Sequence, residues 1–326
     1  MKSVLAALIV IMVLSGCNSN TTPVHTTTTT SVLDARLYGV SGICSAGFPQ
    51  SVDVYEGPLS ASTSAAGNAS IAGGTISDVA VDPTDQSGSI YVSVVPVSIA
   101  TGEIAKFARP NPNGPTPTLT VPVFAAPEEL DFDSNGNLFV LDGNTNAIYT
   151  LSHPITSASL PIKVLQTKSP ALLQGFTLDA SNDLIVLLDT NAGNPAAPVL
   201  LDAYAPPYTG AAASTSNLPP QPWGPSFDAA AGLVFVGSTS SSNTAFWTYS
   251  TPITPNESPS SMMNVQGKVN VGSLAFDTAG NTFFAYPAPA YPCHGGTIAV
   301  AAAPFTGQIA FQFTSPFETH ALAIGP

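Results

Sequence analysis

Charged residues are scarce in this chain, since Asp, Glu, Lys and Arg make up only 8% of its 326 residues. Lys and Arg number 7 against 20 acidic residues, which gives a net charge of −13. Proteins that bind nucleic acid need clustered cations to neutralise phosphates, so this composition excludes nucleic acid as a partner. The acidic balance also provides no electrostatic attraction to anionic lipid head groups.

Apolar runs are short as well, and the one near the start of the chain covers only the eleven residues 4–14. A membrane-spanning helix needs about 20. The run follows Lys2 and ends in Leu14-Ser15-Gly16-Cys17. This arrangement resembles a bacterial lipoprotein signal, in which the cysteine becomes the lipidated first residue of the mature protein. The resemblance implies an acylated Cys17 and a membrane anchor made of lipid. The alternative is an ordinary secretory signal with a chance cysteine.

Residues 18–32 are polar and rich in threonine, with too little apolar content to fold, so we expect a flexible tether. Asn18 directly after the cysteine favours the outer membrane of the cell envelope over the inner one. Residues 33–326 then form one domain, which we expect to be monomeric.

Within that domain a short phrase of two apolar strands joined by an acidic turn occurs six times. The turn positions are 46 to 51 residues apart, at Asp82, Asp133, Asp179, Asp228, Asp277 and Gly325. A period of this length with four short strands per repeat predicts an all-β, six-bladed β-propeller of four-stranded blades. The aspartates stand in Gly- and Asn-rich turns at regular spacing, so we interpret them as structural and not as an acidic cluster.

Six prolines in phase with this repeat mark the ends of the third strands, because proline cannot continue a paired strand. The N-terminal unit has such a strand but lacks a first strand, whereas 321–325 is a first strand with nothing after it. We therefore predict that the C-terminal strand pairs with an N-terminal strand between about Arg36 and Val54. Such a composite blade would close the ring without an exposed sheet edge.

The unit from Leu130 to Asp142 carries Leu-Asp-Phe-Asp, then Gly-Asn, then Leu-Phe-Val-Leu-Asp. It resembles the repeat of NHL-type six-bladed propellers, and weaker copies cover residues 33–326. The resemblance implies the fold. NHL-like propellers include both enzymes and interaction scaffolds, so it leaves the function open.

Of the three cysteines, Cys44 and Cys293 remain after the lipidation signal. Each falls between the second and third strands of its unit, and the two units are neighbours across the predicted seam. Because disulfides persist in exported proteins, we predict a Cys44–Cys293 bond. Two free thiols, or a metal site that uses His294, are the alternatives.

The candidate binding site is the channel mouth, which is built by the segments that lead into each first strand. Carboxylates there offer oxygen ligands for calcium, and Trp223 offers either a stacking platform for a sugar or peptide or simple blade packing. His320 stands near the mouth or at the seam. The residues predicted to face the mouth are Asp78, Glu129, Asp131, Gln174, Trp223, Glu318 and His320.

Two classes of function follow. The first is a non-catalytic binding scaffold of the envelope that presents its mouth to a peptide, a glycan or an envelope protein. The second is a metal-dependent hydrolase or lactonase, because gluconolactonase-like propellers hold a metal with Glu, Asn and Asp at this place. Glu129 and Asp78 lie on plausible blades, but no matching Asn–Asp pair is evident. No nucleophile and base occur at a recognisable spacing, which favours the scaffold.

Overall fold

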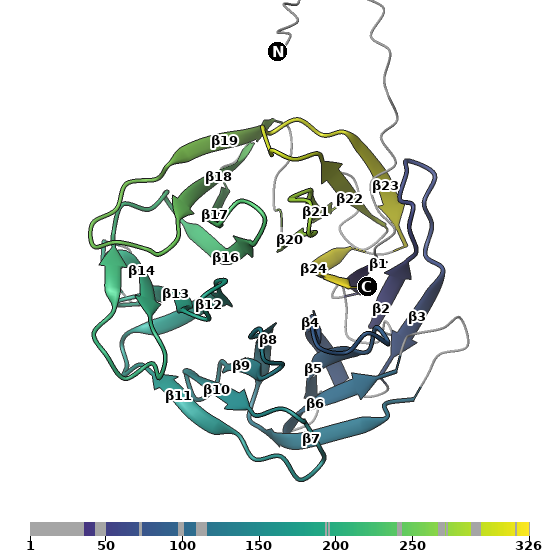
Figure 1. The fold of residues 1–326 in the computed structure, drawn as a ribbon, viewed down its shortest axis with the longest axis horizontal. Helices are drawn as coiled ribbons and strands as arrows, with labels where there is room; N and C mark the ends of the chain where they lie inside the picture. Colours follow the sequence, from purple (N-terminus) through teal and green to yellow (C-terminus); the bar gives the residue numbers. More distant parts are fainter. Residues whose placement is uncertain are drawn as a thin grey trace, which may run out of the picture. The chain divides into compact units, whose positions relative to one another are not determined.

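The computed structural model describes residues 36–42, 50–71, 74–96, 101–108, 116–192, 194, 196–239, 243–266, 271, 273–287, 295–316 and 318–325. Within them, twenty-four strands form six antiparallel four-stranded sheets around a common axis (Figure 1). The predicted six-bladed propeller is confirmed. No helix in the described part of the chain has the length and hydrophobicity that a membrane span requires.

The blades are numbered here in chain order, and in each the first strand listed is innermost (Figure 1). Blade 1 contains β24 (Thr319–Gly325), β1 (Arg36–Ser41), β2 (Ser51–Tyr55) and β3 (Gly67–Ser70). Blade 2 contains β4 (Gly74–Val81), β5 (Ile90–Pro96), β6 (Gly102–Phe107) and β7 (Leu119–Phe124). Blade 3 contains β8 (Pro127–Phe132), β9 (Leu138–Asp142), β10 (Ala147–Leu151) and β11 (Ile162–Gln166).

Blade 4 contains β12 (Leu172–Leu178), β13 (Leu184–Asp189), β14 (Val199–Tyr204) and β15 (Ala213–Thr215). Blade 5 contains β16 (Pro222–Asp228), β17 (Leu233–Thr239), β18 (Asn243–Ser250) and β19 (Ser261–Gln266). Blade 6 contains β20 (Ser273–Phe276), β21 (Thr282–Pro287), β22 (Gly296–Ala301) and β23 (Phe311–Ser315).

Blade 1 is assembled from both ends of the chain, as predicted. Strand β24 pairs antiparallel with β1, from Arg36 opposite Gly325 to Ser41 opposite Thr319. The C-terminal strand thus supplies the inner strand of the first blade and closes the ring.

The core lies between the blades, where six clusters of buried apolar residues each join two neighbours. One recurring contributor is the apolar residue that follows a cis X-Pro bond after the third strand. In five blades this residue packs into the cluster shared with the preceding blade: Leu59, Ile155, Tyr208, Ile253 and Phe305. Besides ending a strand, the repeated prolines are thus followed by an apolar residue that packs between two blades, which we call a wedge residue.

The turn aspartates have the structural role that was predicted for them. Asp133 Oδ1 accepts hydrogen bonds from the backbone N–H groups of Asn135 (2.9 Å) and Asn137 (2.8 Å). Equivalent bonds from the backbone reach Asp82, Asp179, Asp228 and Asp277. Each carboxylate is buried and fixes its own hairpin.

Cys17, Cys44 and Cys293 lie outside the described residues, as do the predicted signal and the whole of the predicted tether, residues 18–32. Cys44 belongs to the connection between β1 and β2, and Cys293 to the connection between β21 and β22. These are equivalent connections of blades 1 and 6, which pack against each other through Tyr55 and Phe313 (ring centroids 5.1 Å apart). The disulfide remains a prediction.

Candidate functional site

The six inner strands line the channel, and most of them carry a β-bulge near their start. The register shifts between Ile76 and Asp78 in β4, between Pro127 and Glu129 in β8, and between Leu173 and Gly175 in β12. Similar shifts occur in β16 and opposite β24. A bulge leaves one residue unpaired and redirects the side chains beside it. Several predicted mouth residues, among them Asp78, Glu129, Gln174 and His320, therefore stand at or directly after a bulge.

Asp78 and Glu129 link inner strands of successive blades. Asp78 Oδ2 in blade 2 accepts a hydrogen bond from the backbone N–H of Leu130 in blade 3 (2.8 Å). Glu129 Oε2 in blade 3 accepts one from the backbone N–H of Phe176 in blade 4 (2.9 Å). These N–H groups lie on the inner edge of the sheet and have no further strand to bond. The two carboxylates thus satisfy backbone donors across the blade boundary.

Asp131 makes the same kind of link with more partners. Its Oδ2 accepts hydrogen bonds from the backbone N–H of Leu178 (2.9 Å) and from the Thr177 hydroxyl (3.0 Å), both in blade 4. Its Oδ1 accepts one from the N–H of Phe132 (2.8 Å). Both oxygens of Asp131 are therefore engaged.

The three carboxyl groups titrate far above their usual range. Burial raises the pKa of Asp78 to about 7 and that of Asp131 to about 6, against the lowering effect of their hydrogen bonds. Burial and the nearby charge of Asp78 raise the pKa of Glu129 to about 8. All three residues keep some exposed surface, as expected of groups that protein surrounds but that face a channel. Near neutral pH the cluster holds protons that isolated carboxylic acids would have released.

The other inner strands present small side chains at the same positions of the repeat. Where blades 2 and 3 have Asp78 and Glu129, the other four blades have Gly175, Gly224, Ser273 and Ala321. Where blade 3 has Asp131, the positions in the other blades are Ala80, Thr177, Ser226, Ala275 and Ala323. At these two positions of the repeat, acidic side chains therefore occur only in blades 2 and 3.

His320 lies between blades 1 and 2. Its Nε2 is 3.3 Å from the backbone carbonyl of Ile76, which suits an N–H donor on that nitrogen. Its Nδ1 is buried and has no hydrogen-bond partner among the described residues. Burial lowers the pKa of His320 to about 4, so the ring is neutral at physiological pH.

The remaining predicted mouth residues have ordinary surroundings. The Trp223 indole lies against Gly237, where an added Cβ would stand 2.2 Å from the ring, and it meets Phe246 edge-on at 5.8 Å. Gln174 is exposed. The backbone carbonyl of Glu318 accepts a hydrogen bond from the N–H of Gly42 (3.2 Å). That these residues share one mouth with the channel carboxylates stays a prediction.

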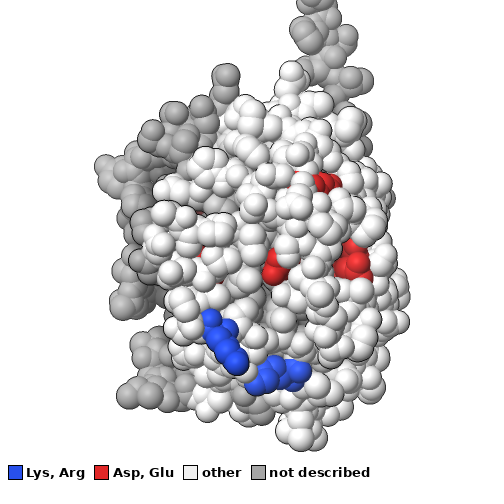
Figure 2. All heavy atoms as spheres, turned by 90° about the vertical axis from the view of Figure 1, so that its left-hand side faces the viewer, with Lys and Arg blue, Asp and Glu red and all other residues white. Residues whose placement is uncertain are grey.

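Among the described residues, no three His, Cys, Asp or Glu side chains are grouped so that they could hold a metal ion. Calcium binding stays a prediction. The scarcity of charge continues on the outer wall, where the flank in Figure 2 is nearly all uncharged, with scattered acidic and basic side chains.

Comparison with known proteins supports the fold alone. No family model and no curated protein sequence matches the chain. A chain from the crystal structure of a nidogen–laminin complex is similar with a TM-score of 0.60 and 14% identity, over 90% of this chain and 98% of that one. A protein of unknown function from Bacteroides caccae is similar with a TM-score of 0.58 and 12% identity, over 90% of this chain and 99% of that one. A protein from Lactobacillus plantarum is similar with a TM-score of 0.52 and 11% identity, over 90% of this chain and 100% of that one.

Proposed function

We propose that the protein is a lipid-anchored propeller of the bacterial cell envelope that acts as a non-catalytic binding scaffold. The observation that carries this proposal is the use made of the channel carboxylates. Asp78, Glu129 and Asp131 each accept, through one carboxylate oxygen, a hydrogen bond from a backbone N–H of the next blade. Groups committed in this way support the ring, and the other inner strands carry small side chains at the equivalent repeat positions.

In this proposal the mouth of the channel meets a peptide, a glycan or an envelope protein. A photo-crosslinking residue at Gln174, which is exposed beside the bulge of β12, should capture a discrete partner in the intact cells of an expressing host. The matched control is the same residue at Leu160, which is 75% exposed beside the outer strand of blade 3. Equal crosslinking at both positions, or none at 174, would contradict docking at the mouth.

The alternative is a metal-dependent hydrolase or lactonase. It is favoured by the raised pKa values of three neighbouring acids, since perturbed carboxyl groups gather at functional sites. Titration with calcium and with manganese, followed by the melting temperature, separates the two. The scaffold predicts no shift. A saturable rise that Glu129→Gln abolishes, and that the inner-strand control Ser273→Ala retains, would favour the hydrolase.

The lipid anchor forms a separate part of the proposal, and it rests on the residues 14–17. Replacing Cys17 by Ser should move the protein from the detergent phase to the aqueous phase after extraction, or leave its signal uncleaved. Unchanged partitioning would refute lipidation without affecting the scaffold proposal.

A further inference from the structure

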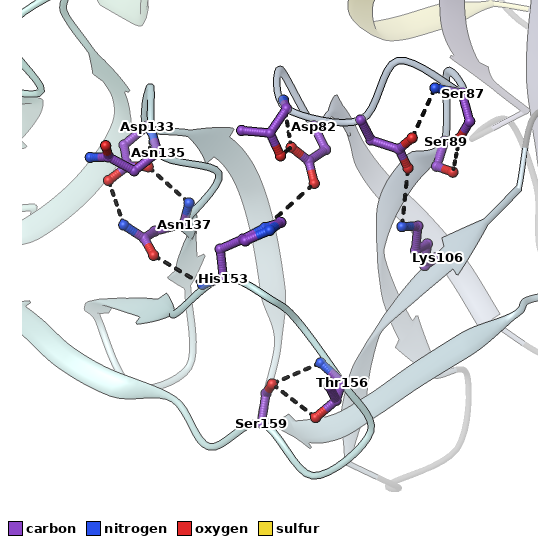
Figure 3. A network of polar contacts seen from close by, with 12 residues as sticks. Asp82, Ser87, Ser89, Lys106, Asp133, Asn135, Asn137, His153, Thr156 and Ser159 are labelled. Carbon is purple, nitrogen blue, oxygen red and sulfur yellow. Dashed lines mark hydrogen bonds and ion pairs between the residues drawn. The ribbon is translucent and has the colours of Figure 1, made fainter.

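A niche recurs at the boundary between blades on the face of the ring that carries the turns after the first strands. Between blades 2 and 3 the side chain of His153 points toward Asp82 across this boundary (Figure 3). The ring of His153 enters the niche, with Nδ1 4.0 Å from Oδ2 of Asp82. A Cβ added to Gly136 would meet that Nδ1 at 2.9 Å and Oγ1 of Thr84 at 3.0 Å. The imidazole and the threonine thus occupy the space next to Gly136.

The equivalent niche between blades 5 and 6 is open. Asp228 stands in the place of Asp82, Ala230 in that of Thr84, and Gly280 in that of Gly136. The residue before the proline, His153 in blade 3, is Ala303 in blade 6. These small residues border a pocket of about 390 Å³. This volume lies within the range of pockets that hold small organic ligands.

The floor of the pocket contains a carboxylate oxygen that lacks a partner. Asp228 is 4% exposed and lines the pocket. Its Oδ1 accepts hydrogen bonds from the N–H groups of Ala230 (2.9 Å) and Ala231 (3.3 Å). Its Oδ2 has no hydrogen-bond partner among the described residues. Oδ2 keeps some contact with solvent, so an ammonium group that enters the pocket can reach it and form a charge-assisted hydrogen bond there.

The turns of blades 3 and 6 show what is missing. There the residue four positions after the aspartate is asparagine, and its amide donates to the second carboxylate oxygen. Asn137 Nδ2 lies 2.7 Å from Asp133 Oδ2, and Asn281 Nδ2 lies 2.6 Å from Asp277 Oδ2. Blade 5 has Gly232 at this position, which has no side-chain amide and a φ of +66°. The niche between blades 5 and 6 therefore lacks both the amide found in the turns of blades 3 and 6 and the imidazole found in blade 3.

We propose that this pocket binds a small organic cation, a primary ammonium group carried on an apolar stem. The ammonium donates to Asp228 Oδ2, and the hydroxyls of Thr248 and Ser261 are further polar groups in the lining. Phe235, Met263 and Phe305 supply apolar and aromatic surface for the stem. The net charge of −13 favours the approach of cations.

The first test is calorimetric titration of the full protein with phenethylammonium, and with the neutral 2-phenylethanol as its isostere. We expect saturable binding of the amine at least about tenfold tighter than of the alcohol. Asp228→Asn keeps the Oδ1 acceptor of the turn and removes the charge, so it should weaken amine binding by about tenfold or more. Asp133→Asn makes the same change in a distant turn and should bind the amine as the parent does.

The second test fills the pocket. Ala303→His places an imidazole where blade 3 has one, and it should abolish amine binding while circular dichroism stays that of the parent. An N-acetylated tripeptide amide with a central lysine distinguishes a protein side chain from a free amine as the source of the ammonium group. The absence of saturable binding of both amines, or binding that neither variant weakens, overturns the proposal.

Discussion

Between blades 2, 3 and 4 the inner strands are linked by carboxylates that accept hydrogen bonds from backbone N–H groups. At the seam between blades 6, 1 and 2 the links are different. Strand β24 pairs with β1, the Ser273 hydroxyl accepts from the N–H of Leu322 (3.1 Å), and His320 faces the carbonyl of Ile76. We call blades 2 to 4 the acidic side of the channel and blades 6, 1 and 2 the seam side. The inner edge of the sheets has unpaired backbone groups on both sides, and different side chains satisfy them on each.

The two sides should therefore lose stability under different conditions. Carboxylates at an inner edge satisfy N–H donors but repel one another and resist ionisation, so that side depends on pH. The seam side carries no such charge and depends instead on whether the C-terminal strand is in place. The stability of the seam side should therefore fall when the C-terminal strand is truncated and rise when a covalent link crosses the seam.

The largest effect is expected from breaking the seam. Deleting residues 321–326 removes most of the ladder with β1 and the buried side chains of Ala321 and Leu322, which exposes an edge in blade 1. We expect loss of the cooperative thermal transition, followed by circular dichroism. Removal of Pro326 alone is the control and should have little effect. A truncated protein that melts like the parent would contradict closure by β24.

The next effect concerns the predicted Cys44–Cys293 bond across the same seam. Chain-entropy estimates for a loop of this size give at most about 5 kcal/mol. Reduction of exported protein should lower the free energy of unfolding and leave its far-ultraviolet circular dichroism unchanged. The variant with both cysteines replaced by serine should not respond to reductant. Peptide mapping that finds both thiols free would remove this link from the account.

On the acidic side, Asp131→Ala leaves the N–H of Leu178 and the hydroxyl of Thr177 without their acceptor. We expect the free energy of unfolding in urea to fall by about 1–3 kcal/mol. Ser226→Ala at the equivalent position of blade 5 is the matched control, since Ser226 makes no such bond among the described residues, and a change within about 0.5 kcal/mol is expected. Equal losses in the two variants would mean that the acidic side has no special role.

The smallest effect is the dependence on pH. The pKa values of Asp78 (about 7) and Glu129 (about 8) lie above those of the unfolded chain, so the folded protein binds more protons in between. The stability from these groups is complete below about pH 4 and is lost as pH rises through 7 and 8. The double variant Asp78→Asn, Glu129→Gln should lose about 1 kcal/mol less than the parent between pH 7.5 and 8.5. Parallel urea-unfolding profiles for both proteins would refute this assignment.

The number of blades, the composite blade and the role of the turn aspartates could all be predicted from the sequence. They depend on a repeat spacing and on residues such as Asp133 and Pro154, whose local effects recur in five of the six units. Even the wedge residues after the prolines, such as Ile155 and Phe305, follow the repeat once it is aligned.

The candidate site was less predictable. Asp78 and Glu129 were predicted at the mouth, but bulges redirect them, and nothing in their own sequence reveals that their partners are backbone N–H groups 47 to 52 residues away. The pocket between blades 5 and 6 is associated with Gly232 and Ala303, which lack the side chains of Asn137 and His153. This difference becomes visible only when the blades are compared in space.

The central claim, that the acidic side of the channel is structural, is tested most directly by a carbon-13 NMR titration of the Asp78, Glu129 and Asp131 carboxyl groups. The titration should be run with and without calcium. The account predicts apparent pKa values near 7, 8 and 6 that calcium leaves unchanged. Values near 4 for the three groups, or saturable shifts on addition of calcium, would contradict it.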